Sequence, residues 1–349
     1  PRDDTSVGAN PTSATYQSWS DNPALCLAHY MTDTEFGVGI PVTKIDWQSV
    51  ADAANDCDVT VDIPGGTEKT FTCNGVAFGT DSHKRNITKL LSSMNGNVMY
   101  ANGKYYIQAG AFDSATESLN ENDLRGPVSI KTSVERGSRF NTIKPIYAAP
   151  SDNYKMMELP PVTVGNLATS RDNGEVLEKQ VQFPFTNGSY MAQRLAHQQV
   201  NRSSDQRVLT FPANLKGMRI KVGDRVQVTL SEFGYTNKVF QCIGWRFGEG
   251  DAGGVDLTLI EDTQSRYTAP ASGFYSQKTN DGTINSGFPG VSVPQSLTAT
   301  GAEKRITVAW TNPVPASSFS RIYVYGGNSN VFANYDKVWQ VNTETITEE

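Results

Sequence analysis

The 349-residue sequence contains only three histidines, and this scarcity restricts the catalytic mechanisms open to it. His29, His83 and His197 each fall on or at the start of a stretch with helical periodicity, and no G-x-S-x-G nucleophile motif accompanies them. The sequence also lacks a P-loop and a G-x-G-x-x-G turn, the common motifs for binding nucleotide phosphates. We therefore predict a protein without enzymatic activity and name no catalytic and no cofactor-binding residue.

The sequence also lacks a strong net charge of either sign. The sequence has 30 Lys and Arg against 36 Asp and Glu, a net charge of −6 and a pI near 5.3, which argues against stable nucleic-acid binding. No run of 18 apolar residues occurs, so a transmembrane helix is excluded. Hydrophobic residues make up 38%, and the 30 glycines and 10% aromatics are typical of a globular, β-rich chain with many turns.

Cysteine is scarce as well. Four cysteines, Cys26, Cys57, Cys73 and Cys242, are too few for a disulfide scaffold. Cys57 and Cys73 flank the turn residues Pro64-Gly65-Gly66 and could meet across them. Reduced thiols in a protein made in the cytoplasm are the favoured alternative.

Metal-binding patterns are incomplete. Cys26 and His29 have the spacing of two ligands on one helix face, but no second pair completes a zinc site. The Gly-rich stretch from Asp251 to Asp256 could offer oxygen ligands to calcium, although a hairpin turn explains it better. We therefore predict no metal site.

Pairs of nearby carboxylates leave glycosidase chemistry open as an alternative, because that reaction needs two carboxyl groups across a cleft. The pairs are Glu121 and Asp123, Glu232 and Glu249, and Glu261 and Asp262.

The first third of the chain predicts a small α+β domain over residues 22–124, after a leading segment over 1–21. Asn22-Pro23 is a helix start signal, and Asp46 is the expected cap of a second helix. Asn102-Gly103 predicts a tight hairpin turn. The expected elements are helices over 23–32, 46–56 and 82–95 (with Gly96 at the C′ position), a strand over 69–73, and a hairpin over 98–107.

Residues 125–268 alternate with a period of two, which predicts a β-barrel-like domain, a Greek-key barrel or sandwich, with one helix through Met191 and Ala196. The expected strands lie at 128–131, 141–144, 181–183, 208–211, 225–230, 239–246 and 255–260.

Residues 269–290 are rich in Gly, Ser, Thr and Asn with few side chains to bury, and predict a linker. The stretch 291–349 resembles an incomplete fibronectin type III β-sandwich, through Pro294 and Leu297, the V-x-W around Trp310 and the strand at Tyr323 to Tyr325. The chain as a whole is thus expected to be a multi-domain α+β and all-β protein, and a segment of a longer polypeptide.

Longer strings carry a more specific resemblance. The first is Asn22-Pro23-Ala24-Leu25 followed by Thr32 to Pro41, with Phe36-Gly37-Val38-Gly39-Ile40-Pro41 at its end. Ile45-Asp46-Trp47, Ala53 to Asp58 and Phe71-Thr72-Cys73-Asn74-Gly75-Val76 follow in order. Weaker collinear strings continue the series: Asn86 to Gly96, Tyr100 to Lys104, Ala192 to Ala196, Gly217 to Val226, and Leu257 to Asp262 with Tyr267. Together they resemble bacteriophage tail tip proteins, the lambda J-like host-specificity proteins that form the central tail hub.

The resemblance implies a homotrimer that closes the distal end of the tail tube and contacts other tail tip and tail tube proteins. It implies synthesis in the bacterial cytoplasm, assembly into the virion, and a role in adsorption and DNA ejection. Host-receptor contact is expected through regions outside this sequence. A near-neutral wall also suits a tube past which DNA slides.

Interface residues are the functional residues we expect, and burial in a barrel core is the equal alternative for them. They are Tyr105, Tyr106, Phe233, Tyr235 and Trp245. Two other functions stay open: a tail-associated cell-wall hydrolase, and a carbohydrate- or protein-binding module that uses Trp310 and Tyr325. For Trp310 a place in the sandwich core is favoured.

Overall fold

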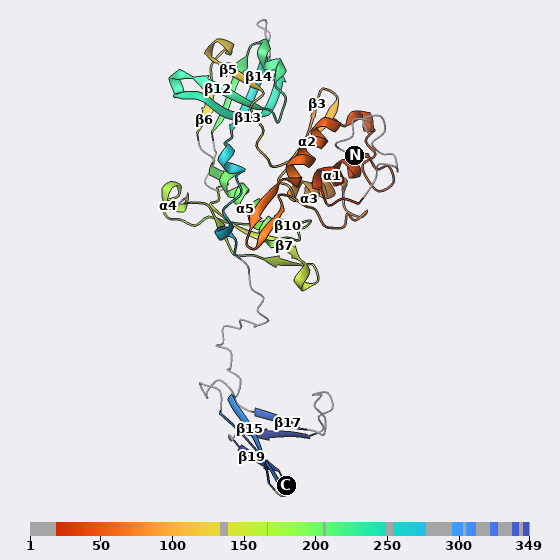
Figure 1. The fold of residues 1–349 in the computed structure, drawn as a ribbon. Coiled ribbons are helices and arrows are strands. Elements are labelled where there is room, and N and C mark those ends of the chain that lie inside the picture. Colours follow the sequence, from red (N-terminus) through yellow and green to blue (C-terminus); the bar gives the residue numbers. More distant parts are fainter. Residues whose placement is uncertain are drawn as a thin grey trace. The chain divides into compact units, whose positions relative to one another are not determined.

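The computed structural model describes residues 19–132, 139–165, 167–204, 207–248, 254–276, 295–302, 305–311, 322–326, 337–341 and 345–348. It divides into two compact units, Pro1–Lys278 and Thr279–Glu349 (Figure 1). The described part is mixed α+β, with far more strands than helices. Within the described residues, no helix has the length and apolarity needed to cross a membrane.

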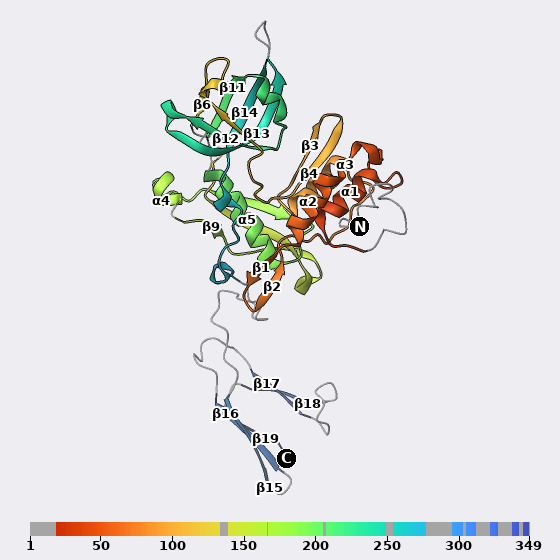
Figure 2. The same ribbon diagram turned by 45° about the horizontal axis from the view of Figure 1, so that its top comes forward.

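Three helices form the start of the first unit: α1 (Pro23–Thr32), α2 (Trp47–Asp58) and α3 (His83–Ser92). The Asn22 side chain accepts hydrogen bonds from the backbone N–H groups of Ala24 and Leu25, and Asp46 caps α2 through the N–H of Ser49. Both predicted caps are confirmed, because each signal is local to its own helix. The three helices lie together in Figure 2, beside β3 and β4.

Helix α3 ends at Ser92 with Ser93 as its C-cap, three residues before the expected end at 95. Asn95, with φ +46°, is the left-handed residue of the turn that follows, and the N–H of Gly96 bonds the carbonyl of Leu91 at 3.1 Å. The prediction of Gly96 as the left-handed residue after the helix is therefore wrong, because Asn95 takes that conformation. The next hairpin, β3 (Asn97–Ala101) and β4 (Lys104–Gln108), turns at Asn102-Gly103 as predicted, with both residues at positive φ.

The predicted strand at 69–73 is wrong. A short hairpin, β1 (Thr60–Ile63) with β2 (Gly66–Lys69), ends at Lys69 instead. Beyond it, the N–H groups of Phe71 and Cys73 bond separate carbonyls, those of Cys57 and Asp21. The alternation in this segment reflects the burial of Phe71 between elements, since no strand ladder forms.

A close backbone approach explains Gly37, just after α1. A Cβ at this position would meet the backbone oxygens of Tyr30 and Asp33, the latter at 2.8 Å. Replacing Gly37 with alanine is expected to lower the free energy of unfolding by about 1–3 kcal/mol, because backbone atoms cannot move aside cheaply. Urea denaturation measures the loss. Gly66→Ala is the control, since nothing lies within 4 Å of a Cβ there; an equal loss in both variants would contradict the steric explanation.

A four-stranded sheet and two helices follow. Its path is β10-β7-β8, with β10 parallel to β7, and β9 also pairs with β7. These strands are β7 (Thr142–Ala149), β8 (Lys155–Glu158), β9 (Val162–Thr163) and β10 (Glu178–Phe183), and the helices are α4 (Leu167–Arg171) and α5 (Ser189–Ser204).

The second sheet of this unit has six strands in the order β5-β12-β13-β14-β11-β6, and its strands are labelled in Figures 1 and 2. In the described residues the edge strands β5 and β6 pair only with β12 and β11, so hydrogen bonding leaves the sheet open and no closed barrel forms. The strands are β5 (Glu117–Asn120), β6 (Ser129–Lys131), β11 (Val208–Ala213), β12 (Arg225–Leu230), β13 (Tyr235–Phe247) and β14 (Val255–Glu261).

Two hydrophobic cores hold the first unit together. The first core joins α1–α3 with β7, β10 and α5, so it draws residues from both sides of the predicted boundary at 124/125. The second core lies in the six-stranded sheet and includes Phe211, Phe240 and Leu257, each at most 1% exposed. The strands within residues 125–268 thus belong to two cores: β7 and β10 contribute to the first core, and β11, β12, β13 and β14 contribute to the second.

Part of the predicted linker is packed. A 3-10 turn at Ser272–Phe274 precedes Tyr275, which is only 9% exposed, and the Gln193 side chain of α5 donates to the carbonyl of Ser276. Tyr275 is thus one buried side chain in a stretch for which few were expected, and residues 277–290 lie outside the described part. Other 3-10 turns lie at Val42–Lys44, Glu121–Asp123, Pro150–Asp152, Leu215–Arg219, Ser231–Phe233 and Gln264–Arg266.

The second unit contains two antiparallel sheets, β15-β16-β19 and β17-β18. Strands were expected near 294–297, 306–310 and 321–325, and the structure adds two more after them. The bounds are β15 (Gln295–Ala302), β16 (Arg305–Thr311), β17 (Ile322–Gly326), β18 (Lys337–Val341) and β19 (Thr345–Glu348).

Candidate functional site

Two distant stretches of sequence meet in a buried charge cluster, which we call the arginine junction: Arg225, Asp262, Arg266 and Tyr267. Arg225 opens β12, and Asp262 follows the last residue of β14. The Asp262 carboxylate accepts from Arg225 Nε at 2.8 Å and from the Tyr267 hydroxyl at 3.1 Å, and it pairs with Arg266 at 2.9 Å. Asp262 is 1% exposed, so its charge is neutralised by these partners rather than by water.

Arg225 also reaches out of the sheet. Its guanidinium donates to the Ala111 carbonyl at 2.6 Å and to the Asp113 carboxylate at 3.0 Å. The rings of Phe112 and Tyr267 lie 4.9 and 5.1 Å from the guanidinium carbon, which is cation–π distance. One buried side chain therefore fastens the loop after β4 to the six-stranded sheet.

Further contacts strengthen the same attachment. The N–H of Thr116 donates to the Arg225 carbonyl at 2.9 Å. The Gln241 side chain of β13 donates to the Gln108 side chain of β4 and to the carbonyl of Gly223, both at 3.2 Å. Because Gln108 belongs to the hairpin packed on the first core, these contacts and the arginine junction together link the two cores of the unit.

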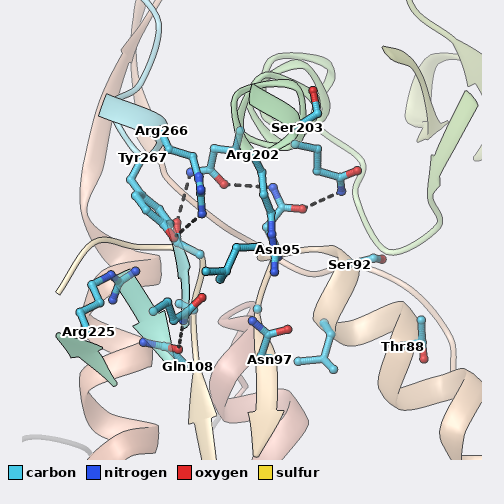
Figure 3. A pocket seen from close by; sticks show the side chains of 18 of the residues that line it. Thr88, Ser92, Asn95, Asn97, Gln108, Arg202, Ser203, Arg225, Arg266 and Tyr267 are labelled. Carbon is cyan, nitrogen blue, oxygen red and sulfur yellow. Dashed lines mark hydrogen bonds between the residues drawn. The ribbon is translucent and has the colours of Figure 1, made fainter. Parts of the chain in front are cut away.

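A pocket of about 600 Å³ opens beside the junction (Figure 3). Figure 3 shows Arg266 and Tyr267 on one side of it, Gln108 beneath, and Asn95 and Arg202 on the opposite side. The walls come from α3, β3, β4, α5, the six-stranded sheet and the turn after it. The polar lining residues are Thr88, Ser92, Asn95, Asn97, Gln108, Arg139, Gln198, Gln199, Arg202, Ser203, Arg225, Gln241, Arg266 and Tyr267.

The pocket wall carries arginines and amides but no carboxylate, so its chemistry suits a polar or anionic group better than a cation. Much of this polarity is already satisfied within the protein. The Asn95 amide donates to the Leu195 carbonyl and to Gln198, and Gln199 donates back to Asn95. The network holds α5 against the end of α3, which is a structural role.

One carboxyl near the junction titrates at an unusual pH. Burial raises the pKa of Asp56 to about 6, the charges of Asp113 and Asp52 act in the same direction, and Arg225 opposes them. The folded protein therefore binds this proton more tightly than the unfolded chain, whose carboxyl has a pKa near 3.8. Ionisation of Asp56 thus lowers stability as pH rises from about 4 through about 6.

Replacing Asp56 with asparagine removes this cost. We expect the free energy of unfolding to rise by about 1–2 kcal/mol at about pH 7.5, and by much less at about pH 4. Urea denaturation at both pH values measures the difference. Asp62→Asn, at an exposed position of β1, is the control with no expected gain; an equal gain in the control, or the same gain at both pH values, would refute the assignment.

The three histidines have different surroundings in the described part of the chain. His29 lies on the exposed side of α1, and His83 hydrogen-bonds the Tyr30 hydroxyl at 3.0 Å. The His197 ring packs on Phe274, and burial lowers its pKa. Among the described residues, no three His, Cys, Asp or Glu side chains group as metal ligands would; Asp251 lies outside the described residues.

The candidate carboxylate pairs are engaged in structural contacts. Asp123 accepts from Asn214 and completes a capping box with Asn120, and Glu121 accepts from the N–H of Ser231. Glu261 pairs with Lys238 and Arg207 at 2.6 and 3.6 Å. Asp262 belongs to the arginine junction. Glu249 lies outside the described residues, so the pair with Glu232 has no described geometry.

Of the five predicted interface aromatics, only Phe233, at 43%, is a strongly exposed side chain. Tyr105 is half-buried against the first core, and Tyr106 lies under the ammonium group of Lys221 at 4.9 Å. Tyr235 and Trp245 pack against the second core, and Trp245 donates to the Gly217 carbonyl at 3.2 Å. Their role as interface residues stays a prediction. Aromatic side chains with greater exposure are Trp19, Phe36, Phe78, Tyr100, Tyr154 and Phe247.

The arginine junction was not among the predicted sites. Composition and periodicity gave no signal for it, because an arginine at the start of a strand normally predicts an exposed side chain. The only available signal was that Arg225, Asp262 and Tyr267 fall within the strings that resemble tail tip proteins. Nothing in those strings predicts that the three side chains meet.

Comparison with known proteins gave structural matches alone: no protein-family model and no curated protein matches the chain. The virion of a native gene transfer agent particle matches with a TM-score of 0.47 and 12% identity, over 76% of this chain and 57% of the matched chain. A tail protein from Neisseria meningitidis MC58 matches with a TM-score of 0.38 and 17% identity, over 53% and 56%. The 43 kDa tail protein of prophage MuSo2 from Shewanella oneidensis gives 0.38 and 14%, over 58% and 59%. This chain thus spans under two thirds of each matched chain.

Proposed function

We propose that this chain is a structural part of a phage tail tip, in which three copies form the central hub at the distal end of the tail tube. The proposal rests on where the residues that carry the resemblance to tail tip proteins lie in the fold. Asn22 and Asp46 cap helices, Phe71 and Leu195 lie in the first core, and Arg225 and Asp262 form the arginine junction. These residues build a frame, as a hub subunit requires.

The proposed hub carries the host-recognition apparatus for adsorption and DNA ejection, and it contacts other tail tip and tail tube proteins. Receptor contact belongs to regions outside this sequence. The net charge of −6 supports a wall that DNA passes without stable binding. In this proposal the protein is made in the bacterial cytoplasm and resides in the virion.

An incomplete fibronectin type III-like sandwich is proposed for residues 291–349. The pairing of β15, β16 and β19 in one sheet, with β17 and β18 in another, supports it. In such sandwiches the first, second and fifth strands share a sheet while the third lies in the opposite one.

Antibody labelling of purified particles tests the proposed location. We expect an antibody against this chain to mark the distal end of the tail in electron micrographs, whereas an antibody against the tail tube protein marks its length. Label on the head, or no chain in purified particles, would overturn the proposal.

A cell-wall hydrolase is the rival function, and the engagement of Asp123, Glu261 and Asp262 in structural contacts argues against it. Incubating the purified chain with peptidoglycan is expected to release no soluble fragments. Release that a single Asp or Glu substitution abolishes would establish the hydrolase instead.

A further inference from the structure

Asparagine followed by glycine occurs five times in the sequence. The steps are Asn74-Gly75, Asn95-Gly96, Asn102-Gly103, Asn173-Gly174 and Asn187-Gly188. An asparagine in this position can lose its side-chain amide spontaneously, because the glycine has no side chain to hinder attack by its backbone nitrogen. The reaction needs a free amide and a free nitrogen, so the hydrogen bonds of the fold decide which of the five steps can react.

Hydrogen bonds hold the side chains of three of these asparagines. The Asn95 amide donates to the Leu195 carbonyl at 2.9 Å, and its oxygen accepts from Gln199 at 2.8 Å. The Asn74 amide donates to the oxygen of the Asn187 side chain at 3.1 Å. A held amide cannot turn toward the following nitrogen without losing its partner, so these three steps are protected in the folded chain.

The step at Asn173 is held through the backbone instead. The Asn173 side chain is exposed, but the N–H of Gly174 donates to the Ala168 carbonyl at 2.7 Å. The N–H of Glu175 donates to the Asp172 carbonyl at 3.0 Å, which closes the same turn. The nitrogen that would attack is therefore occupied, and it must leave its carbonyl before it can react.

The step at Asn102 has neither kind of protection. Asn102 and Gly103 form the tip of the β3–β4 hairpin, with φ of +49° and +77°, and the Asn102 side chain is exposed. Within the described part of the chain, neither the Asn102 side chain nor the Gly103 N–H has a hydrogen-bond partner. Nothing lies within 4 Å of a Cβ placed on Gly103, so neighbouring groups leave room for the tip to rearrange.

We propose that Asn102 is a site of spontaneous modification, at which the folded chain loses the side-chain amide and gains aspartate or isoaspartate. The site depends only on the hydrogen bonds of one hairpin. It therefore goes beyond the proposed function and does not require it.

The reaction consumes one water molecule and releases one molecule of ammonia. The Gly103 nitrogen loses its proton and attacks Asn102 Cγ, so that an N–Cγ bond forms and the Cγ–Nδ2 bond breaks. Nδ2 leaves as ammonia, and a five-membered succinimide ring remains. Water then adds to one of the two ring carbonyl carbons and breaks the bond from that carbon to the Gly103 nitrogen. Opening at Cγ gives aspartate, and opening at the backbone carbonyl carbon gives isoaspartate.

The isoaspartate product changes a hairpin that is attached to α2. The Tyr105 carbonyl accepts from the Asp46 N–H at 2.9 Å, and the Ile107 N–H donates to Ser49 Oγ at 3.1 Å. Tyr100 lies opposite Tyr105 in the ladder, and their rings are 4.8 Å apart. Isoaspartate adds one carbon to the backbone of a two-residue turn, so the turn no longer matches this register. We therefore expect the modified hairpin to exchange its amide hydrogens faster than the original one.

Peptide mapping of the full chain tests the site. After incubation of the folded chain in mildly alkaline buffer, mass spectrometry is expected to show amide loss at Asn102 at least about fivefold faster than at any other Asn-Gly step, which is the factor that one hydrogen bond provides. Incubation in urea is the control, and there we expect the five rates to converge. Similar rates in the folded chain, or faster loss at another step, would overturn the proposal.

Two variants separate the hydrogen bonds from the local sequence. Asn74→Ala removes the partner of the Asn187 side chain, so we expect amide loss at Asn187 to rise roughly fivefold while the rate at Asn102 stays the same. Asn102→Gly keeps a residue pair that this turn accepts, and it is expected to abolish the early acidic form of the folded chain on ion exchange. An unchanged rate at Asn187, or an acidic form that still appears at the original rate, would contradict the assignment.

Discussion

Replacing Asp262 with alanine is expected to lower the free energy of unfolding by about 3–5 kcal/mol. The variant leaves Arg225 and Arg266, at 2% and 4% exposure, without the carboxylate that both contact. Arg225 keeps its contact with the half-exposed Asp113 carboxylate, but the buried carboxylate that compensates the desolvation of both arginines is lost. Urea denaturation at neutral pH measures the loss.

The matched control is an ion pair on the same sheet whose charges are screened by water. Arg246 pairs with Asp256 at 3.0 Å, and its side chain is 77% exposed. Arg246→Ala is therefore expected to cost less than about 1 kcal/mol. Hydrogen exchange adds a local readout: in Asp262→Ala we expect faster exchange at the Thr116 amide, which bonds the Arg225 carbonyl. Comparable losses in the two variants would show that Asp262 does not hold the junction together.

The second large loss of stability is expected from a substitution in the second core, which lies in the six-stranded sheet. Phe211 lies in β11 and is 1% exposed, and its replacement by alanine leaves a cavity that the surrounding strands cannot fill. We expect a loss of about 3–5 kcal/mol in the free energy of unfolding. Chemical denaturation followed by circular dichroism measures it.

Phe247 provides the control of identical chemistry, because it belongs to β13 of the same sheet but is 65% exposed. Phe247→Ala is expected to change the free energy of unfolding by less than about 0.5 kcal/mol. If Phe247→Ala destabilised the chain as much as Phe211→Ala, the assignment of the core face of this sheet would be wrong.

Local signals in the sequence predicted local structure well. The capping residues Asn22 and Asp46 act on N–H groups two or three residues away, and the Asn102-Gly103 turn joins two adjacent strands. The strand over 225–230 matches β12 in both bounds. Such features depend on nearest neighbours, so a single sequence contains enough information to predict them.

Features that depend on distant pairing could not be predicted in the same way. The parallel pairs β10 with β7 and β12 with β5 join segments far apart in the chain, and they decide which core each strand belongs to. The same limit applies to the candidate site: Arg225 and Asp262 are 37 residues apart, and neither stretch by itself indicates that the two side chains pair. Tyr275 was assigned to a linker for the same reason, since its partner Tyr190 lies on α5.

Cryo-electron microscopy of the tail tip in particles that contain this chain tests the proposed hub most directly. We expect three copies related by a threefold axis at the distal end of the tail tube, with the first unit, Pro1–Lys278, forming a closed ring. A single copy, a sixfold arrangement, or a position away from the distal end would contradict the proposal.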